Sequence, residues 1–326
     1  MNTINFGILA TGSIAEKFTK TCSYVMGVTA YGVASRTLEK AQAFAQKNGV
    51  PHSYGSYEAL VKDPNIHAVY VATPHPMHFE NCMLALENGK HVLCEKPMVM
   101  TKAQAVALFG YAKAQGLFLM EAMWSRFLPN IITAKRWIEE GQIGRIRFID
   151  AMLTFAVGSI DAAHRLVDPS LGGGSLYDLG VYTVELSSYL AGANPLAYAG
   201  FHTDYCKGTD ATAALTVKYP RGILATMRTG LVVNSREVLT VVGDKGRIEI
   251  QRPHFANEVR LYIGDELTEQ IQMEYDLPRG HAWQLEAVCG YLRDGITESP
   301  VMPAADTIAT IEMLETLKNS FDAHQD

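Results

Sequence analysis

Up to Glu121, short apolar runs alternate with segments of helical periodicity, and this alternation restricts the chain to a small group of folds. The runs NFGILA (residues 5–10) and AVYVAT (residues 68–73) are almost continuously apolar, which is typical of parallel strands buried on both faces. Joined by right-handed crossovers, such units predict a doubly wound α/β domain. We expect strands at 5–10, 29–35, 52–54, 68–72, 91–94 and 118–121, and helices at 13–25, 38–48, 57–61, 76–88 and 102–115.

From about residue 141 the pattern changes to longer runs in which apolar and polar residues alternate, such as IGRIRFIDAMLTF (residues 143–155). Alternation with period two, broken by short turns, predicts a mostly antiparallel sheet with one open face. Three helical patterns make this half α+β, at 174–190, 281–292 and 304–321. We therefore predict two domains, residues 1–121 and 122–326. Because a wide sheet face needs a cover, we also expect a homodimer through the second sheet.

The composition excludes several classes of protein. The net charge is −6 and no long basic run is present, which argues against nucleic-acid binding. No tract reaches the ~18 apolar residues that a membrane span needs. The cysteines are scattered and form no CxxC pair, which indicates reduced thiols of a cytoplasmic protein and no disulfide framework or zinc site. These cysteines are Cys22, Cys82, Cys94, Cys206 and Cys289.

The turn after the first predicted strand reads ATGSIA, an A-x-G-x-x-A form of the dinucleotide-binding fingerprint. Gly12 would let the backbone approach a pyrophosphate, and the next helix would offer free N–H groups to it. Alanine at the first position, where glycine is usual, weakens the match, and the alternative is a purely structural turn. We interpret the turn as a nucleotide site with cofactor contacts from Ala10, Thr11, Gly12, Ser13 and Ile14.

The end of the second predicted strand indicates which nucleotide binds. NAD sites usually carry Asp or Glu here for the ribose 2′-hydroxyl, and this chain has neither. Ser35 and Arg36 follow instead, and a guanidinium can bind a 2′-phosphate. The alternative is that Ser35 or Thr37 caps the next helix and Arg36 is simply solvated. The residues favour NADP(H) as the cofactor, with NAD(H) possible.

Lys96 follows the fifth predicted strand, between Glu95 and Pro97. In open α/β sheets ligands bind beyond the carboxyl ends of the strands, so we expect Lys96 beside the nicotinamide. A partly desolvated lysine can exchange protons near neutral pH. Pro97 favours an extended backbone for the lysine before it. The alternative is a solvated lysine in a turn.

Four stretches of the chain resemble the glucose–fructose oxidoreductase / inositol dehydrogenase / MocA (Gfo/Idh/MocA) family: GILATGSIA, VASR, VYVATPHPMHFENCMLALENGKHVLCEKP and LGGGSLYDLGVY. EAMWSRFLP, followed by the last of these, is similar to the branch of dimeric dihydrodiol dehydrogenases and NADP-dependent D-xylose dehydrogenases. The resemblance implies a Rossmann domain, a C-terminal domain with an open-faced sheet, and NAD(P). It also implies that Lys96 lies in the active site, often with a cis peptide before Pro97.

The same resemblance implies roles for Asp178 and Tyr182. Four residues apart, they would share one face of a helix. Many family members have His at the position of Tyr182, whereas the dihydrodiol and xylose branch has Tyr. We expect Tyr182 to transfer the proton of a substrate hydroxyl with help from Lys96, and Asp178 to orient the substrate. A buried tyrosine and a helix-capping aspartate are the alternative.

The remaining candidates are less specific. Thr73, Pro74, His78 and Glu95 are predicted to contact the cofactor, Glu95 from the family pattern alone. His75 and His78 lack further ligands in the sequence for a metal site, so we expect no metal. An aromatic pocket with a few polar groups suits a sugar or cyclic diol. For that pocket we predict Trp124, Arg126, Phe155 and Arg165, beside His75, Asp178 and Tyr182. For Trp124 and Arg126 the alternative is packing between the domains.

The prediction for the whole chain is an NAD(P)-dependent oxidoreductase with NADP preferred. It would transfer a hydride between nicotinamide and a hydroxyl or carbonyl carbon of a sugar, sugar derivative or cyclic diol. Two alternatives remain open. One is a non-catalytic NAD(P)-binding regulator, and the other is an NAD-dependent glycoside-cleaving enzyme on the same scaffold.

Overall fold

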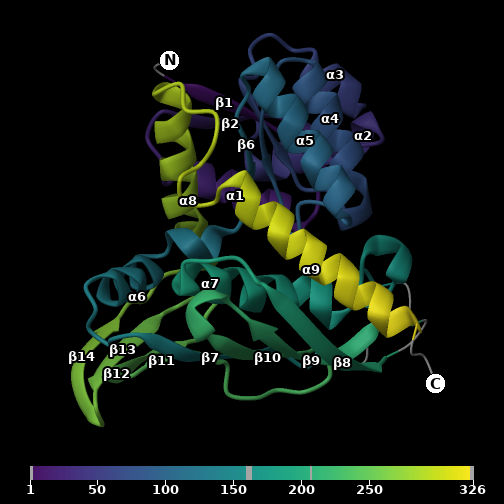
Figure 1. Ribbon diagram of the computed structural model, residues 1–326. Helices are drawn as coiled ribbons and strands as arrows, with labels where there is room; N and C mark the ends of the chain where they lie inside the picture. The colour runs from purple at the N-terminus through teal and green to yellow at the C-terminus, as the bar shows by residue number, and fades with distance from the viewer. Residues whose placement is uncertain (1–2, 159–163, 206–207, 324–326) are drawn as a thin grey trace. The chain divides into compact units, whose positions relative to one another are not determined.

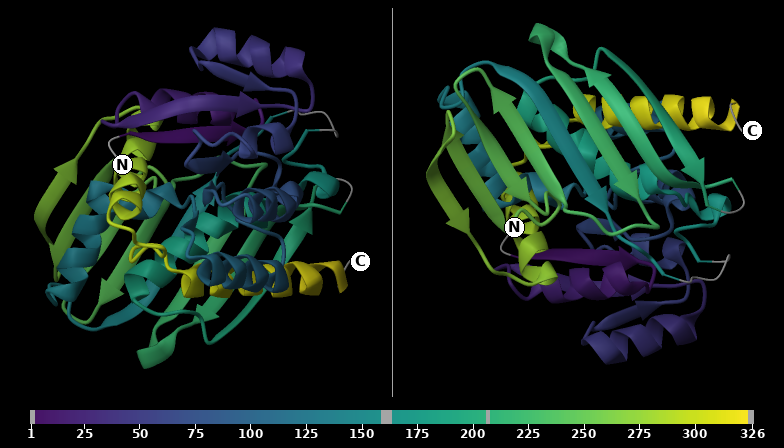
Figure 2. Two further views of the ribbon diagram at one scale, coloured as in Figure 1. Left: turned by 90° about the horizontal axis from the view of Figure 1, so that it is seen from above. Right: turned by 90° about the horizontal axis from the view of Figure 1, so that it is seen from below.

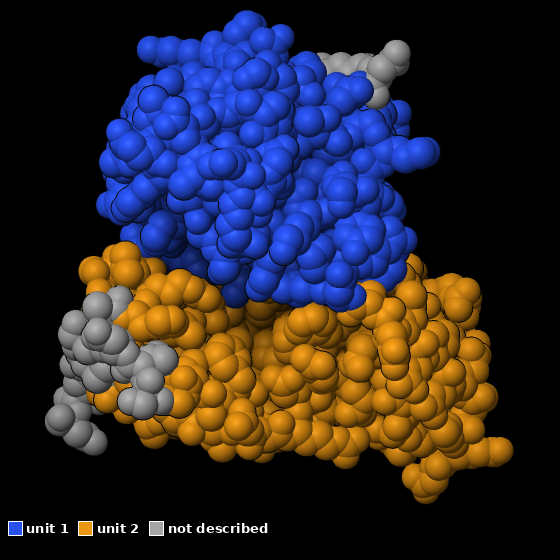
Figure 3. Space-filling model, turned by 180° about the vertical axis from the view of Figure 1, so that it is seen from behind, with its two compact units in different colours: residues 1–124, 276–307 blue, residues 125–275, 308–326 orange. Residues whose placement is uncertain are grey.

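The computed structural model describes residues 3–158, 164–205 and 208–323. The chain forms two compact units, coloured separately in Figure 3. Unit 1 contains residues 1–124 and 276–307, and unit 2 contains residues 125–275 and 308–326. The sequence predicted one continuous second domain from residue 122. In the structure, residues 276–307 belong instead to the first unit.

Unit 1 holds a parallel sheet of six strands in the order β3-β2-β1-β4-β5-β6. This order, with its reversal beside the first strand, is that of dinucleotide-binding domains. Figure 1 labels β1, β2 and β6 of this sheet. The strands are β1 (Ile4–Leu9), β2 (Val28–Ala34), β3 (His52–Tyr54), β4 (Ala68–Val71), β5 (His91–Cys94) and β6 (Leu119–Glu121). Every residue of β4 and β6 is buried, as expected for strands covered on both faces. The predicted doubly wound sheet is confirmed.

The helices of unit 1 are α1 (Ser13–Cys22), α2 (Leu38–Asn48), α3 (Tyr57–Val61), α4 (His78–Glu87), α5 (Lys102–Gln115) and α8 (Leu277–Arg293). Local sequence explains where several of them begin. The hydroxyls of Thr37, Ser56 and Thr101 cap α2, α3 and α5. Helix α8 packs on α1 and hydrogen-bonds to it through the carbonyl of Pro278, 3.2 Å from the Thr21 hydroxyl. This packing is why the segment joins unit 1.

Unit 2 holds a sheet of eight strands in the order β14-β13-β12-β11-β7-β10-β9-β8. Only β7 and β10 run parallel among the described pairs, so the predicted mostly antiparallel sheet is confirmed. The strands are β7 (Ile146–Thr154), β8 (Ala197–Asp204), β9 (Asp210–Lys218), β10 (Leu224–Gly230), β11 (Val238–Gly243), β12 (Gly246–Gln251), β13 (Glu258–Ile263) and β14 (Glu266–Gln272). Helices α6 (Pro129–Glu139) and α7 (Val181–Ala191) pack on one face.

The other face of this sheet carries no helix in the part of the chain that the structure describes, as the right-hand view of Figure 2 shows. Burial alternates along β9 and β10, so one residue in two points to this open face. It includes large apolar side chains. Phe201 is 85% exposed, Phe148 is 53% exposed and Leu224 is 44% exposed.

Three elements of unit 2 were not among those predicted from the sequence: α6, β8 and β14. Strand β14 has six exposed residues among its seven, so it lacks the apolar alternation that reveals a strand. The predicted helix at 174–190 also differs. It begins with a π-helical turn, Leu176–Gly180, before α7. The last helix, α9 (Ala304–Ala323), agrees with prediction at its first residue.

Four cysteines lie in the described residues, and all four are free and buried. Burial raises the pKa of Cys289 to about 12 and raises that of Cys22 further still. Burial and a raised pKa both disfavour the thiolate, so Cys22 and Cys289 have the surroundings of structural cysteines. Cys206, the fifth, lies outside the described residues.

Candidate functional site

The predicted phosphate-binding turn lies at the carboxyl end of β1. Gly12 is the N-cap residue of α1 and, being a glycine, makes no side-chain cap hydrogen bond to this helix. A methyl group built on Gly12 would meet nothing within 4 Å, so open space faces the helix N-terminus there. Uncapped N–H groups and the helix dipole favour an anion at such a place. The turn therefore fits a pyrophosphate.

Ala10 adopts a conformation that favours glycine. Its φ is 86°, in the region where a side chain clashes with the neighbouring carbonyl. The cost is about 1–2 kcal/mol relative to a normal backbone conformation. The first glycine of the usual fingerprint makes the same tight turn without that cost. Ala10 thus departs from the pattern in residue type and keeps its geometry.

At the carboxyl end of β2 the structure shows which residue caps α2. The hydroxyl of Thr37 accepts the amide of Lys40, so Thr37 caps α2. Ser35 is buried, and its amide donates to the carbonyl of Tyr54 at 3.2 Å. Arg36 is exposed and forms no ion pair with any described residue. The structure thus has the arrangement of the alternative, with Thr37 as the helix cap and Arg36 exposed, and the cofactor contacts of Ser35 and Arg36 stay a prediction.

Lys96 stands at the same edge of the sheet, in the segment that follows β5. The peptide between Lys96 and Pro97 is cis, as the resemblance implied. Strands β1, β4 and β5 are parallel neighbours, so their carboxyl ends meet at one edge. The phosphate-binding turn, the loop after β4 and Lys96 all follow from those ends. The turn at Gly12 and Lys96 thus lie at the same edge of the unit 1 sheet.

Buried side chains hold the backbone of Pro97 and Met98, the two residues that follow Lys96. The Pro97 carbonyl lies 3.0 Å from Nδ1 of His78, and Nε2 of His78 lies 2.7 Å from the Thr73 carbonyl. The Met98 amide donates to Oε1 of Glu121 at 2.8 Å. His78 and Glu121 are fully buried. Together they tie the Lys96 segment to the loop after β4 and to the end of β6, which limits the positions open to Lys96.

His78 was predicted to contact the cofactor, and the structure gives it these backbone contacts instead. Burial lowers the pKa of His78, although the carbonyls of Thr73 and Pro97 oppose that shift. The His78 ring thus bridges the loop after β4, through Thr73, and the segment after β5, through Pro97. His75, also a predicted site residue, lies with its ring 5.7 Å from that of His78. The hydroxyl of Thr73 accepts an amide hydrogen bond from Asn81 at 3.1 Å.

Glu95, which only the family pattern pointed to, orients its neighbours. Its Oε1 accepts the Tyr70 hydroxyl, and its Oε2 accepts the Lys96 amide at 3.2 Å. Sequence reasoning missed the partners Glu121, Asn81 and Tyr70. One signal was present for Glu121, which is the single charge in the apolar run FLMEAM at the end of a strand.

The other predicted catalytic residues lie in unit 2. Asp178 belongs to the π-helical turn and Tyr182 to the first turn of α7, and both are largely buried. Nη1 of Arg165 lies 3.1 Å from Oδ1 of Asp178, with the arginine half exposed. The ring of Tyr182 packs at 5.9 Å from that of His254. The structure thus joins two predicted residues, Arg165 and Asp178. A π-helical turn is frequent at functional sites.

Three further predicted substrate residues have distinct surroundings. The indole of Trp124 stacks on His281 within unit 1, with ring centroids 4.4 Å apart, and burial lowers the pKa of His281 to about 4. Arg126 is fully buried in unit 2 and forms an ion pair with the equally buried Glu185 of α7. Phe155 follows β7 and is partly exposed. Of the three, Arg126 has the surroundings of a structural residue, since its charge is neutralised inside the unit.

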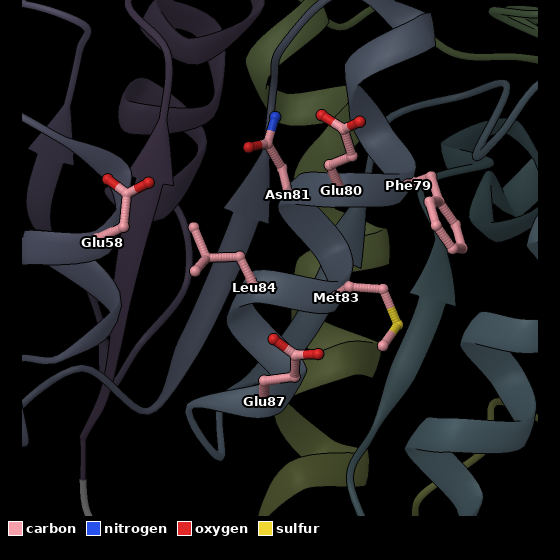
Figure 4. Close-up of a pocket in the computed structure, with 7 residues that line it drawn as sticks. All are labelled: Glu58, Phe79, Glu80, Asn81, Met83, Leu84 and Glu87. Carbon is pink, nitrogen blue, oxygen red and sulfur yellow. The ribbon is translucent and has the colours of Figure 1, made fainter.

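A surface groove of about 550 Å³ lies on α4, and its lining includes neither the turn at Gly12 nor the Lys96 segment. Figure 4 shows the side chains that line it. Most of its side chains come from α4, and Glu58 comes from α3. The three carboxylates Glu58, Glu80 and Glu87 line it. Such a wall repels phosphate, so this groove does not suit a dinucleotide.

Over residues 3–158, 164–205 and 208–323, no helix is long and apolar enough to cross a bilayer. In the same residues no three His, Cys, Asp or Glu side chains are grouped so as to hold a metal ion.

Comparison with known proteins places the chain in a family. Residues 4–123 match the model of an oxidoreductase family with an NAD-binding Rossmann fold, and residues 131–249 match the GFO/IDH/MocA C-terminal domain. The chain is 35% identical to trans-1,2-dihydrobenzene-1,2-diol dehydrogenase of Mus musculus, over 97% of this chain and 96% of that protein.

Solved structures share the fold. Levoglucosan dehydrogenase in complex with NADH and levoglucosan superposes with a TM-score of 0.90 at 19% identity, covering 99% of this chain and 98% of that one. A 3-ketoreductase from Actinomadura kijaniata, in complex with NADP and TDP-benzene, gives 0.85 at 24% identity, with 98% of each chain covered. With both family models matched in order, the chain belongs to the GFO/IDH/MocA family of NAD(P)-binding oxidoreductases.

Proposed function

We propose that the chain is a dehydrogenase that oxidises a hydroxyl of a sugar or cyclic diol, or reduces the corresponding carbonyl, with NADP as its preferred cofactor. The observation that carries this proposal is the fixed backbone at Lys96: His78 and Glu121 hold Pro97 and Met98, the two residues that follow the lysine, and Glu95 accepts its amide. The relatives named as a diol dehydrogenase and a sugar dehydrogenase support the substrate class.

The chemistry divides between the cofactor and the side chains. Bound nicotinamide would supply the acceptor or donor of the hydride. Tyr182 would take the proton of the substrate hydroxyl or return it to the carbonyl oxygen. Lys96 would stabilise the negative charge that develops on that oxygen. Asp178, held by Arg165, would accept a hydrogen bond from a neighbouring hydroxyl and orient the ring.

A direct test is a substrate panel with purified protein. Cyclic trans-diols and aldoses such as D-xylose are offered with NADP⁺, and the ultraviolet absorbance of reduced nicotinamide is followed. Turnover on either class supports the proposal. Absence of turnover on the whole panel, with NADP still bound, would indicate a regulator. Product formation without net reduction of the nicotinamide would indicate the glycoside-cleaving alternative.

The preference for NADP leads to a prediction at Arg36. Replacing Arg36 with Ala should raise the dissociation constant for NADP⁺ about 10-fold or more, since one charge-assisted hydrogen bond to phosphate is worth roughly 1.5–3 kcal/mol. The constant for NAD⁺ should change little. Fluorescence titration of both nucleotides measures this, with Lys40→Ala as a control at another exposed cation nearby. Equal losses for the two nucleotides would contradict a 2′-phosphate contact.

We also propose that the open face of the unit 2 sheet forms a homodimer. Phe201 lies opposite Ala214 and Leu224 lies opposite Phe148 in the ladder, so these apolar side chains share one face. Exposed apolar area of this kind marks an interaction site.

The four buried free thiols support a further proposal, a reducing cytoplasmic location.

Replacing Phe201 with Asp should shift the protein from dimer to monomer in analytical ultracentrifugation, because a charge would enter the buried interface. Met26→Asp is the matched control, since Met26 is 91% exposed and lies in unit 1. A wild-type protein that sediments as a monomer at all concentrations, or a Phe201→Asp dimer, would contradict the proposed interface.

A further inference from the structure

A buried carboxylate in unit 2 holds the turn that carries Asp178. Asp210 is the first residue of β9 and is only 2% exposed. Its Oδ2 accepts two hydrogen bonds, from the Leu176 amide at 2.7 Å and from the Ser175 hydroxyl at 2.7 Å. Leu176 is the first residue of the π-helical turn. Asp210 therefore binds the start of this turn directly.

The same contacts reach a second strand. The Ser175 hydroxyl lies 2.9 Å from that of Thr229 in β10, and both residues are buried. Strands β9 and β10 are neighbours in the sheet. The beginning of the turn is thus attached through one serine to two strands, which are among the most rigid parts of such a fold.

Gly174 makes room for this arrangement. A methyl group built on it would lie 2.1 Å from Oδ1 of Asp210, and its φ is +111°, so a larger residue would be both strained and blocked. The Gly174 amide donates to the Leu166 carbonyl at 2.9 Å. Leu166 follows Arg165, the partner of Asp178. The glycine therefore links the Asp210 contact to the segment that carries Arg165.

A carboxylate at this place has an energetic cost. Desolvation raises the pKa of Asp210, while the donors Ser175 and Leu176 oppose the rise. Its Oδ1 has no hydrogen-bond partner among the described residues. Both donors use a single oxygen, so the contact needs an acceptor at that position and does not need the second oxygen. A substitution that keeps the acceptor oxygen and removes the charge can therefore test the role of Asp210.

We propose that Asp210 is a positioning residue, which fixes the π-helical turn at Leu176 and thereby sets where Asp178 and, four residues later, Tyr182 stand. It touches neither substrate nor cofactor in this role. The proposal deepens the proposed function and rests on it for the activity readout alone. The structural part stands on the contacts of Ser175, Leu176 and Asp210.

The test compares Asp210→Ala with Asp210→Asn. Alanine removes the acceptor, and we expect kcat to fall about 10- to 100-fold, as for a small misplacement of a catalytic group. Asparagine keeps an oxygen for both donors, and kcat should stay within about fivefold of wild type. The dissociation constant for NADP⁺, whose predicted contacts lie in unit 1, should not change in either variant. Asp204→Ala is the matched control, because Asp204 pairs with Asp210 in the ladder and is exposed.

Hydrogen exchange supplies a readout that does not depend on activity. Amides of residues 174–182 should exchange faster in Asp210→Ala and at the wild-type rate in Asp210→Asn. If Asp210→Ala does not fold, Ser175→Ala, which removes one of the two donors, should show the same change to a smaller degree. Unchanged exchange in a folded Asp210→Ala or Ser175→Ala protein overturns the proposal. If the wild type proves inactive on the substrate panel, the proposed function fails and the exchange measurement still decides the positioning role.

Discussion

Replacing Lys96 with Met should lower kcat by about 10²- to 10⁴-fold, the range of a lost acid–base or charge-stabilising group. Methionine keeps the length of the side chain and removes its charge. The segment around it is held by His78 and Glu121 through backbone atoms, so the fold of the loop should survive. The dissociation constant for NADP⁺ should therefore stay close to the wild-type value.

Steady-state kinetics with the best substrate of the panel measure this effect, and nucleotide titration measures the cofactor affinity. Lys113→Met is the matched control, since Lys113 is an exposed lysine of α5. A parallel fall in kcat and in NADP⁺ affinity would point to a binding role. A Lys96→Met protein with wild-type turnover would show that the proposed assignment of Lys96 is wrong.

Replacing Tyr182 with Phe should lower kcat by a similar factor, about 10²- to 10⁴-fold, because it removes only the hydroxyl that we propose exchanges the substrate proton. The ring keeps its packing against His254. KM should change much less than kcat, since the hydroxyl acts mainly in the transition state. Tyr198→Phe is the matched control, for it loses a hydroxyl that contacts Thr316 at 3.3 Å in the same unit.

The Lys96→Met/Tyr182→Phe double variant tests whether the two residues act as one. If they do, its kcat should be about as low as that of the worse single variant, because groups that act as a unit are not additive. Losses that multiply would instead show independent roles. A Tyr182→Phe protein as active as wild type would assign proton transfer to another group.

The predicted and observed element bounds agree best where neighbouring residues determine where a helix or strand begins and ends. The helices at 38–48, 57–61 and 102–115 and the strands at 52–54 and 91–94 have the predicted bounds. Caps such as Thr37 and Thr101 are adjacent in sequence to the helices that they start, so a linear reading finds them. For the same reason the turn at Gly12 and the position of Lys96 after a buried strand could be predicted.

The supports of these residues could not be predicted in this way. Met98 and Glu121 are 23 residues apart, Leu176 and Asp210 are 34 apart, and Arg126 and Glu185 are 59 apart. No periodicity within one element brings such pairs together. Arg126 shows the consequence, because its sequence context suggested a substrate contact and its buried partner is visible only in the fold.

The sequence by itself determined the parallel sheet, the succession of strands and helices along the chain up to Glu121, and the edge where Gly12 and Lys96 stand. These follow from hydrophobic periodicity and turn chemistry, which act over a few residues. Three features are visible only in the tertiary structure. Residues 276–307 belong to unit 1, and His78 and Glu121 bind the segment that follows Lys96. Asp210 accepts a hydrogen bond from the first residue of the turn that carries Asp178. Those contacts join residues far apart in the chain, and buried polar groups find such partners only when folding has brought the strands side by side.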